Sequence, residues 1–401
     1  MIPFFPAIRA GKPRTGLFAA MFSVLFLLPV STRATDLSIR ILSDAAHAHV
    51  LFTAELGQYL VYDGDHRPIM ELAQGSALSV AIKDGQIELK KGEELVGVFY
   101  NLIFEGKGLK AIFSLQAGNK PAGQKRFFDD HLDVSVDKTK LFFINHVDLE
   151  NYVAGVVQSE VRGISDQTDF YKVQAIISRT YAMGNLRRHN EEGFDLCDNV
   201  HCQVYKCRNN TPIVLTATVQ SAGEVIVDGK DHLITASFFS NSGGQTANSE
   251  DVWNSPVSYL RSVVDTFSLG MKNATWEKVM PKSEWLSFLA KTYHYDIHDE
   301  VMKDSALHFE QPERKVNFAG GIPLKNIRRD LQLRSTFFSV SVKGNDVILS
   351  GRGYGHGVGL SQEGVVRMID LGYSVPEAIG HYYTGVTIKL LEELPAGKLG
   401  D

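Results

Sequence analysis

The stretch LENYVAGVVQSEVRG, residues 149–163, has the spacing of an amphipathic helix. At about 100° per residue, one apolar stripe contains Leu149, Tyr152, Val153, Val156, Val157 and Val161. Glu160 lies in the middle of that stripe, where burial disfavours an ionised carboxylate and raises its pKa. The stretch therefore predicts a helix packed on a core, with the Glu160 carboxylate on the buried face for a functional reason.

Length and composition limit the number of structural units and the classes of partner. The chain has 401 residues, of which 44% are hydrophobic and 22% charged, with a net charge of -5. A single core usually stops growing below this length, so we expect two structural units. The charge balance gives no reason to expect a nucleic-acid partner.

The first 35 residues have the pattern of an export signal. Arg9, Lys12 and Arg14 precede the apolar run LFAAMFSVLFLLPV, and the small residues of STRAT follow it, with a cleavage site near Ala34. The apolar run is shorter than the roughly 20 residues that a membrane span needs. We therefore predict a signal peptide over residues 1–35 and an exported protein of the periplasm or cell envelope, membrane-anchored if the segment is left uncleaved.

The spacing of apolar and polar residues predicts strands and helices in the rest of the chain. Residues 36–136 predict a small β-rich unit of unknown role. A second helix is expected at FYKVQAIISRTYAMGNL (170–186), followed by strands at GEVIVDG (223–229) and LITASFFSNSGG (233–244). An insertion at about 259–333 contains a helix, KSEWLSFLAKTY (282–293), and a hairpin follows at 336–351. We predict an α+β fold, in which a helical pair packs beside mixed or antiparallel strands and forms a cleft, and a tail at 391–401.

A glycine-rich segment, GRGYGHGVGLSQ, begins at Gly351 with glycine at every second position. The spacing matches neither a dinucleotide fingerprint nor a P-loop. We expect an extended chain with one bare face, which allows a flat ligand or another backbone to come close, while Tyr354 and His356 project from the other face.

A polar cluster, FFSNSGGQTANSEDVWN, begins at Phe238, inside the strand that is predicted over residues 233–244. Its neutral donors and acceptors suit a hydroxyl-rich or amide-rich ligand, on which Trp253 could stack, and they equally suit an ordinary polar loop. Ser242 does not lie in a G-x-S-x-G elbow, so nothing indicates a serine hydrolase.

Three cysteines, Cys197, Cys202 and Cys207, lie within eleven residues, CDNVHCQVYKC. One interpretation is a closed, structural zinc site, because His189, Cys197, His201 and Cys202 supply the number and type of ligands that such a site requires. The other is one short disulfide and a free thiol.

Six separated motifs resemble the SpoIID/LytB domain over roughly residues 137–390. They are VDLENYVAGVVQSEV, KVQAIISRTYA, HCQVY, SNSGGQTANSEDVW, LRSTFFSV and the segment from GRGYGHGVGLSQEGVVRMIDLGYS to IGHYYTG. The resemblance implies a bacterial cell-wall protein, whose enzymatic members are lytic transglycosylases acting on glycan strands without stem peptides.

The resemblance also implies residue roles. The essential acid of the family matches Glu160, whose raised pKa would keep it protonated near neutral pH. Six further positions, and Tyr354 discussed above, match sugar-binding positions of the family: Arg179, Tyr181, Ser242, Gln245, His356 and Gln362. One branch of the family holds zinc in an arrangement similar to HCQVY, which supports the metal interpretation.

Two other functions compete with the transglycosylase. A non-catalytic module could bind peptide-free glycan strands and recruit or modulate a cell-wall amidase. A zinc amidase would need three ligands, an open position and a nearby acid, and no such spacing is visible. The presence of Glu160 favours the enzyme.

Overall fold

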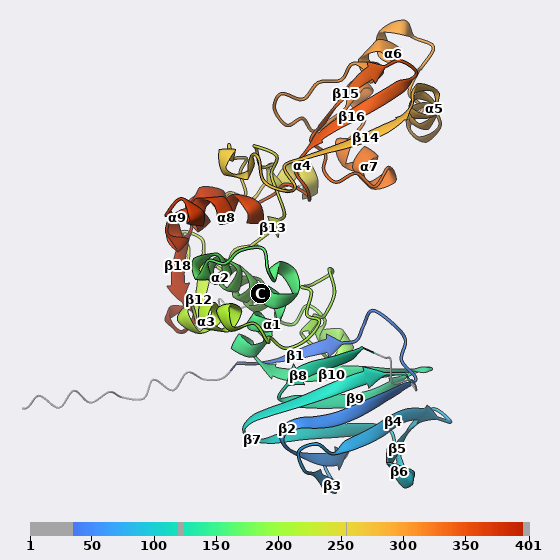
Figure 1. Ribbon diagram of the computed structural model, residues 1–401, viewed down its shortest axis with the longest axis vertical. Helices are drawn as coiled ribbons and strands as arrows, with labels where there is room; N and C mark the ends of the chain where they lie inside the picture. Colours follow the sequence, from blue (N-terminus) through green and yellow to red (C-terminus); the bar gives the residue numbers. More distant parts are fainter. Residues whose placement is uncertain (1–34, 119–123, 254, 396–401) are drawn as a thin grey trace, which may run out of the picture. The chain divides into compact units, whose positions relative to one another are not determined.

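The computed structural model describes residues 35–118, 124–253 and 255–395 (Figure 1). The predicted signal segment up to residue 34 and the last six residues of the predicted tail lie outside this part of the chain. Export and cleavage therefore stay predictions. Within the described residues, no helix is both long enough and apolar enough to cross a membrane.

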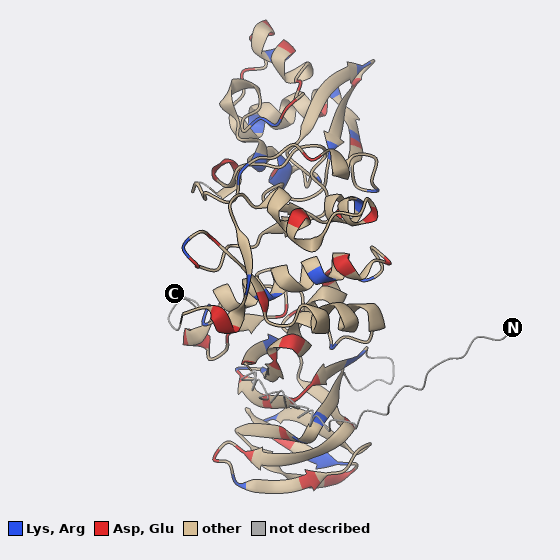
Figure 2. Cartoon of the chain, turned by 90° about the vertical axis from the view of Figure 1, so that its left-hand side faces the viewer, with Lys and Arg blue, Asp and Glu red and all other residues tan. Residues whose placement is uncertain are grey.

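The N-terminal part forms one large sheet. The strand order is β11-β1-β10-β9-β7-β2-β4-β5-β6, with β3 paired to β2 and β8 to β7. These strands are β1 Asp36–Ile41, β2 His49–Asp63, β3 Pro68–Leu72, β4 Ala77–Lys83, β5 Gln86–Lys91, β6 Glu94–Phe99, β7 Asn101–Ala117, β8 Lys125–Asp129, β9 His131–Asp137, β10 Lys140–Asp148 and β11 Leu196–Cys197. Acidic and basic residues are interspersed along this sheet (Figure 2).

The opening helix follows the sheet directly. Strand β10 ends at Asp148, whose side chain accepts hydrogen bonds from the backbone N–H groups of Glu150 and Asn151 and so caps the helix. The helices of this part are α1 Leu149–Val161, α2 Thr168–Gly184 and α3 Pro212–Gln220. All six apolar residues of the predicted stripe are at most 5% exposed. The predicted helix is confirmed, and β10 fixes where it begins.

The remaining chain adds short strands and helices. They are β12 Glu224–Val227, β13 Phe238–Phe239, α4 Ser249–Trp253, β14 Thr275–Pro281, α5 Lys282–Tyr293, α6 Glu300–Leu307, α7 Leu324–Asp330, β15 Phe338–Lys343, β16 Asp346–Arg352, β17 Leu360–Ser361, α8 Gln362–Asp370, α9 Val375–Tyr382 and β18 Thr387–Leu390. Short 3-10 helices are η1 Asn190–Glu192, η2 Thr266–Ser268, η3 Ala319–Gly321 and η4 Leu391–Glu393.

Strands β14, β16 and β15 form a separate antiparallel sheet. With α5, α6 and α7 it encloses its own hydrophobic core, in which Trp285 and Leu349 are fully buried. Two strands of this sheet follow the predicted insertion, residues 259–333, and the predicted boundary after residue 136 falls inside β9 of the large sheet, before its last residue. The α+β class is confirmed, and the domain boundaries stay predictions.

The glycine-rich segment differs from its prediction. Strand β16 ends at Arg352, and the next glycines have positive φ angles, 75° at Gly353 and 79° at Gly359, so the prediction of an extended run is wrong beyond that point. The prediction of a close backbone is confirmed. A Cβ on Gly353 would lie 2.5 Å from the carbonyl oxygen of Asn241, and one on Gly359 2.2 Å from that of Ser237.

The neighbouring prediction of a strand over residues 233–244 is largely wrong. Only Phe238 and Phe239 form a strand there, parallel to Leu360 and Ser361. The predicted helix at 282–293 and the predicted hairpin are present as α5, β15 and β16.

Candidate functional site

Glu160 lies in the last turn of α1 and is partly buried. Its Oε1 accepts a hydrogen bond of 3.2 Å from the backbone N–H of Val204, and its Oε2 has no partner among the described residues. Burial raises the pKa of the Glu160 carboxyl, and the Val204 hydrogen bond opposes that rise in part. No charged neighbour contributes to the shift. The group is therefore held so that it favours its protonated form.

The loop of residues 203–211 covers the same end of α1. Gly155 allows this close approach, because a Cβ there would lie 2.4 Å from the Tyr205 ring. The side chain of Gln158 accepts from the backbone N–H of Asn210 at 2.8 Å, and Ser159 Oγ accepts from that of Lys206 at 3.1 Å. Three consecutive side chains of α1, ending at Glu160, thus bind backbone groups of one loop.

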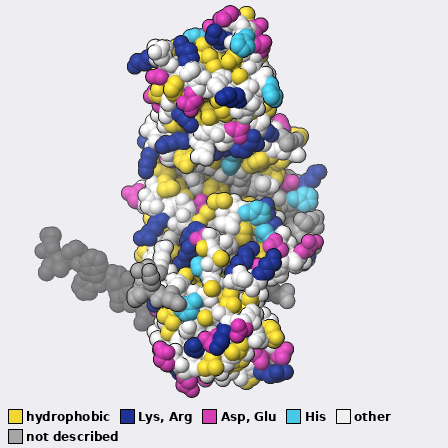
Figure 3. Space-filling view, turned by 90° about the vertical axis from the view of Figure 1, so that its right-hand side faces the viewer, with side chains coloured by type: hydrophobic (Ala, Val, Ile, Leu, Met, Phe, Trp, Pro, Cys, Tyr) yellow, Lys and Arg dark blue, Asp and Glu magenta, His cyan; other side chains and the backbone are white. Residues whose placement is uncertain are grey.

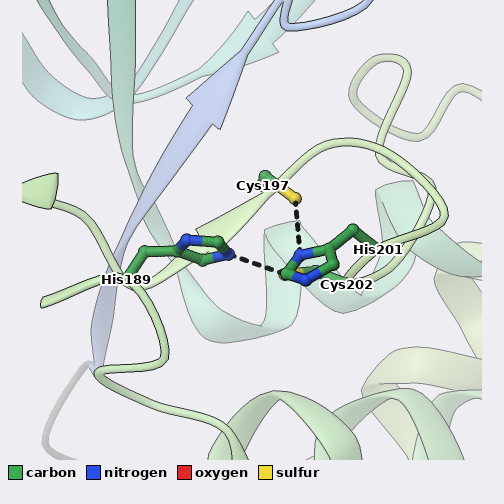
Figure 4. A group of neighbouring side chains, drawn as sticks. All are labelled: His189, Cys197, His201 and Cys202. Carbon is green, nitrogen blue, oxygen red and sulfur yellow. Dashed lines mark hydrogen bonds between the residues drawn. The ribbon is translucent and has the colours of Figure 1, made fainter.

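Four potential metal ligands converge at the start of this loop (Figure 4). One donor atom from each of His189, Cys197, His201 and Cys202 lies within 4.8 Å of the others. His201 Nδ1 lies 3.8 Å from Cys197 Sγ and 3.7 Å from Cys202 Sγ, and His189 Nε2 lies 3.4 Å from Cys202 Sγ. Two thiols and two imidazoles at these separations match a tetrahedral zinc site with small adjustments.

The surroundings of the cluster support this ligand set. Glu192 Oε1 lies 2.6 Å from His189 Nδ1, so the carboxylate accepts that N–H and leaves Nε2 directed at the thiols. Ligating histidines usually have such a partner on the second nitrogen. All three cysteines are free, and Cys207 lies apart, with its sulfur 3.5 Å from Gln158 Nε2.

Tyr181 of α2 lies near this cluster. Its hydroxyl accepts a hydrogen bond from Arg188 Nη1, and its pKa is raised by burial and, to a smaller extent, by Cys202 and Cys197. This position brings one predicted sugar-binding residue to the same end of the helical pair as the loop that bonds Glu160.

Arg179 is placed differently from its prediction. Its side chain is fully buried, and its guanidinium donates to both carboxylate oxygens of Glu150 and to the carbonyl of Glu224. All three of these bonds are internal, so Arg179 presents no exposed donor to a sugar. Its position favours a structural role, in which it ties α2 to the first turn of α1.

Ser242 and Gln245 form part of an internal network. Ser242 is fully buried and donates to Asp265 Oδ2 at 2.7 Å, while its carbonyl accepts from Arg314 Nη2 at 2.8 Å. Gln245 accepts from the backbone N–H of Arg314 and donates to Ser262. Most of the hydrogen-bonding capacity of this polar cluster is used inside the protein, as in the alternative of an ordinary polar loop.

Tyr354 and His356 differ in exposure although they are two residues apart. Tyr354 is 45% exposed, whereas His356 Nε2 donates to the carbonyl of Phe238 and Nδ1 accepts from the N–H of Val358. Burial is the main cause that lowers the pKa of His356 to about 4. Only Tyr354 of this pair can contact a ligand without breaking internal bonds.

Gln362 lies at the start of α8 and is nearly buried. Its Nε2 donates to Gln174 Oε1 of α2 at 3.4 Å. Most of the predicted site residues fall into two groups. The first contains Glu160, Tyr181 and the four potential metal ligands. The second contains Ser242, Gln245, Tyr354 and His356. Among the described side chains, no hydrogen bond joins Glu160 to the second group.

Sequence reasoning missed several residues. Glu150 and Glu192 are the carboxylates that position Arg179 and His189. The first pair is distant in the sequence and the second is three residues apart, and the motifs indicate neither pairing. The buried amide nitrogens of Gln174 and Gln203 have no partner in the described part of the chain.

The matches to known proteins cover this region. A model for the family described as SpoIID, Stage II sporulation protein, matches residues 137–227, which include Glu160, Tyr181 and all four potential metal ligands. Stage II sporulation protein D of Bacillus subtilis is 30% identical over 294 residues, covering 67% of this chain and 83% of that relative. This chain belongs to the SpoIID family.

Two further relatives extend the comparison. Stage II sporulation protein D of Bacillus amyloliquefaciens is 29% identical over 281 residues, covering 64% of this chain and 78% of the relative. The protein named Amidase enhancer of Bacillus subtilis is 23% identical over 287 residues, covering 58% of this chain and 40% of the relative. The chain is thus a cell-wall-related member of the SpoIID family.

Proposed function

We propose that this protein is an exported lytic transglycosylase of the cell envelope, and that it cleaves peptide-free glycan strands between N-acetylmuramic acid and N-acetylglucosamine. The observation that carries the proposal is the state of Glu160. Its burial raises the pKa, and one of its oxygens is free of any partner among the described residues. A proton donor near neutral pH needs both properties.

The reaction needs one carboxyl group. Glu160 donates its proton to the glycosidic oxygen as the bond to the anomeric carbon of N-acetylmuramic acid breaks. The resulting carboxylate then takes the proton of the muramic 6-hydroxyl, whose oxygen attacks the anomeric carbon and closes a 1,6-anhydro ring. Hydrolysis by the usual glycosidase routes needs a second acidic residue, and none of the described acidic residues contributes to the pKa shift of Glu160.

The residues around Glu160 would hold it rather than react. The Val204 N–H orients the carboxyl through Oε1 and leaves Oε2 for the substrate. Tyr181, which is partly buried, and the exposed ring of Tyr354 are sugar-binding candidates that keep accessible surface. Arg179, Ser242 and His356 would support the framework through their internal bonds.

We further propose that His189, Cys197, His201 and Cys202 hold a structural zinc ion. Four protein ligands would leave no open position, so the ion would fix the fold of the loop and supply no catalytic water. The distances among the donor atoms and the carboxylate on His189 support this assignment. Val204 follows Cys202 by two residues, so the same site would fix the N–H that orients Glu160.

The second candidate function is a glycan-binding module that recruits or modulates a cell-wall amidase. The observation that favours it is the similarity to the protein named Amidase enhancer. In this alternative the cleft would bind peptide-free glycan strands without cleaving them, and Glu160 would be a buried carboxylate without a chemical role.

The deciding experiment compares the purified protein with its Glu160→Gln variant on peptide-free glycan strands. We expect 1,6-anhydro products by mass spectrometry from the wild type, and a loss of at least about 100-fold in rate from the variant, as is typical when a general acid is removed. Glu71→Gln is the matched control, because Glu71 is an exposed glutamate on β3. Full cleavage by the Glu160→Gln protein would refute the assignment, and intact strands that sediment with both proteins would support the binding module.

A further inference from the structure

A cavity of about 460 Å³ lies between α7, the turn that follows it and the glycine-rich segment. Four cationic side chains and one aromatic ring line it: Lys325, Arg328, Arg329, Arg334 and Tyr354. The space-filling view shows Lys and Arg side chains lying among acidic and apolar ones over one face of the molecule (Figure 3). No acidic residue lines the cavity, although the whole chain has a net charge of -5.

Two of the arginines that line this cavity have no ion-pair partner among the described residues. Arg329 pairs with Asp330 at 2.7 Å, but none of the ion pairs in the described part of the chain involves Arg328 or Arg334. Arg328 Nε donates only to the carbonyl of Leu333, at 3.3 Å, and burial lowers its pKa. A partly buried guanidinium without a carboxylate partner is costly, and an anion bound in the cavity would remove that cost.

Two further guanidinium groups add to the same positive region. The guanidinium groups of Arg314 and Arg352 donate to carbonyl and hydroxyl oxygens and have no carboxylate partner within the described residues. The pKa of Arg314 falls to about 9 because of burial and, in smaller part, because of Arg352 and Arg328. These side chains repel one another, so the region as a whole favours a negatively charged ligand.

The aromatic ring makes the cavity specific for more than charge. The guanidinium of Arg334 lies 5.7 Å from the centre of the Tyr354 ring, so a planar cation and an exposed aromatic face are adjacent. Trp253 is 42% exposed and lies 5.2 Å from the ring of His356, two residues from Tyr354. An aromatic face suits the apolar face of a sugar ring, and an arginine fork suits a carboxylate. Nucleic acid would need a longer positive surface than one cavity provides.

We propose that this cavity binds a carboxylate-bearing sugar, with Arg328 and Arg334 on the carboxylate and Tyr354 against the ring. The identity of the sugar rests on the proposed function. In a peptide-free glycan strand, every N-acetylmuramic acid carries a free lactyl carboxylate, which is an amide when a stem peptide is attached. The cavity would therefore favour strands from which the peptides have been removed, because only these present a carboxylate next to the sugar ring.

The test measures binding without cleavage. N-acetylmuramic acid, N-acetylglucosamine, lactate and inorganic phosphate are titrated separately into the purified protein, and binding is followed by ligand-observed NMR. We expect N-acetylmuramic acid to bind at least about tenfold more tightly than the other three, because it alone combines the ring and the carboxylate. Equal binding of phosphate would show a general anion site and overturn the proposal, as would failure of N-acetylmuramic acid to bind.

Variants locate the binding. We expect Arg334→Gln to weaken binding of N-acetylmuramic acid about tenfold, and Arg334→Lys to weaken it less, since lysine keeps the charge but not the fork. Arg67→Gln is the matched control, because Arg67 is an exposed arginine that contacts Asp63 and Asp65 near β3. Unchanged binding by Arg334→Gln and by Arg328→Gln would overturn the proposal. Binding by a protein that fails to cleave glycan would refute the transglycosylase alone, and cleavage without this binding would refute the cavity alone.

Discussion

Glu160 and His356 are two partly buried ionisable side chains in two segments that carry family motifs, and they differ in how many of their hydrogen bonds are made. Burial favours the neutral form of both, raising the pKa of Glu160 and lowering that of His356 to about 4. Both ring nitrogens of His356 have backbone partners, the carbonyl of Phe238 and the N–H of Val358. Only one oxygen of Glu160 has a partner in the described chain, the N–H of Val204.

The difference separates a structural group from a chemical one. A buried side chain whose partners are all internal stabilises one conformation, and a ligand gains nothing by approaching it. A buried carboxyl with one free oxygen keeps capacity for a substrate and favours the form that can donate a proton. The pKa shift alone does not distinguish these cases, because burial produces it in both.

The largest expected effect concerns the loop beside Glu160, whose Val204 N–H holds one oxygen of the carboxyl. We expect the purified protein to contain one zinc per chain, and Cys202→Ser to lose the metal together with about 5 kcal/mol or more of unfolding free energy, since structural zinc sites contribute on this scale. Metal analysis and urea unfolding measure both quantities.

Cys207→Ser is the matched control for that test. Cys207 lies in the same loop but outside the cluster of four donors. The Cys207→Ser protein should keep the zinc and most of the unfolding free energy of the wild type. Absence of zinc from the wild type, or an equal zinc content in the Cys202→Ser protein, would contradict the assignment.

On the His356 side, Gly359→Ala tests whether the glycine-rich segment is packed as tightly as its contacts indicate. The new Cβ would meet the carbonyl oxygen of Ser237 at 2.2 Å in addition to the strain of a positive φ. We expect a loss of roughly 3 kcal/mol of stability, combining about 1 kcal/mol for the backbone conformation with the cost of overpacking. Denaturant unfolding measures the loss.

Gly372→Ala provides the comparison. Gly372 also has a positive φ, 88°, but a Cβ there meets no atom within 4 Å. We expect only about 1 kcal/mol of destabilisation. Equal losses at the two positions would mean that the segment near His356 can move, and it would then be a better ligand site than its contacts suggest.

His356 should make the fold sensitive to acid. Its pKa is lowered from an ordinary value of 6.5 to about 4, so below pH 6.5 the unfolded chain takes up a proton that the folded chain refuses. Stability attributable to this group therefore falls as the pH falls from about 6.5 to 4, by as much as about 3 kcal/mol. His356→Gln should flatten the pH dependence of unfolding in this window, whatever its effect at pH 7. The exposed residue His232 gives the control, and a matching change in His232→Gln would exclude His356 as the cause.

Sequence patterns predicted the features that depend on neighbours along the chain. The stripe around Glu160 follows from helical spacing, and the four candidate metal ligands that the structure brings together are a small set of residue types within fourteen positions, His189 to Cys202. Helix α5 and the hairpin of β15 and β16 follow from similar local signals. These predictions needed no information about packing.

Predictions that depend on distant neighbours were less successful. Arg179 was expected to bind sugar, but Glu150 lies 29 residues away and occupies its guanidinium. The glycine-rich run was expected to be extended, but packing against residues 237–243 requires positive φ angles instead. The basic cavity was not predicted at all, because it combines α7 with Tyr354, about two dozen residues further along the chain.

The smallest effect tests Glu160 as a buried acid without reference to glycan. Because its folded pKa is raised above the ordinary 4.5, its ionisation destabilises the fold as the pH rises through the folded pKa. Glu160→Gln removes the ionisation and keeps a group of the same size, so we expect it to be more stable than the wild type at pH 7, where burial opposes the ionised carboxylate. The difference should shrink as the pH falls well below 4.5, where the carboxyl is neutral in both the folded and the unfolded chain. Glu71→Gln is the control substitution at an exposed position. A less stable Glu160→Gln protein at pH 7 would mean that Glu160 is an ionised structural acceptor like the internal groups around His356, and the contrast between the two sites would disappear.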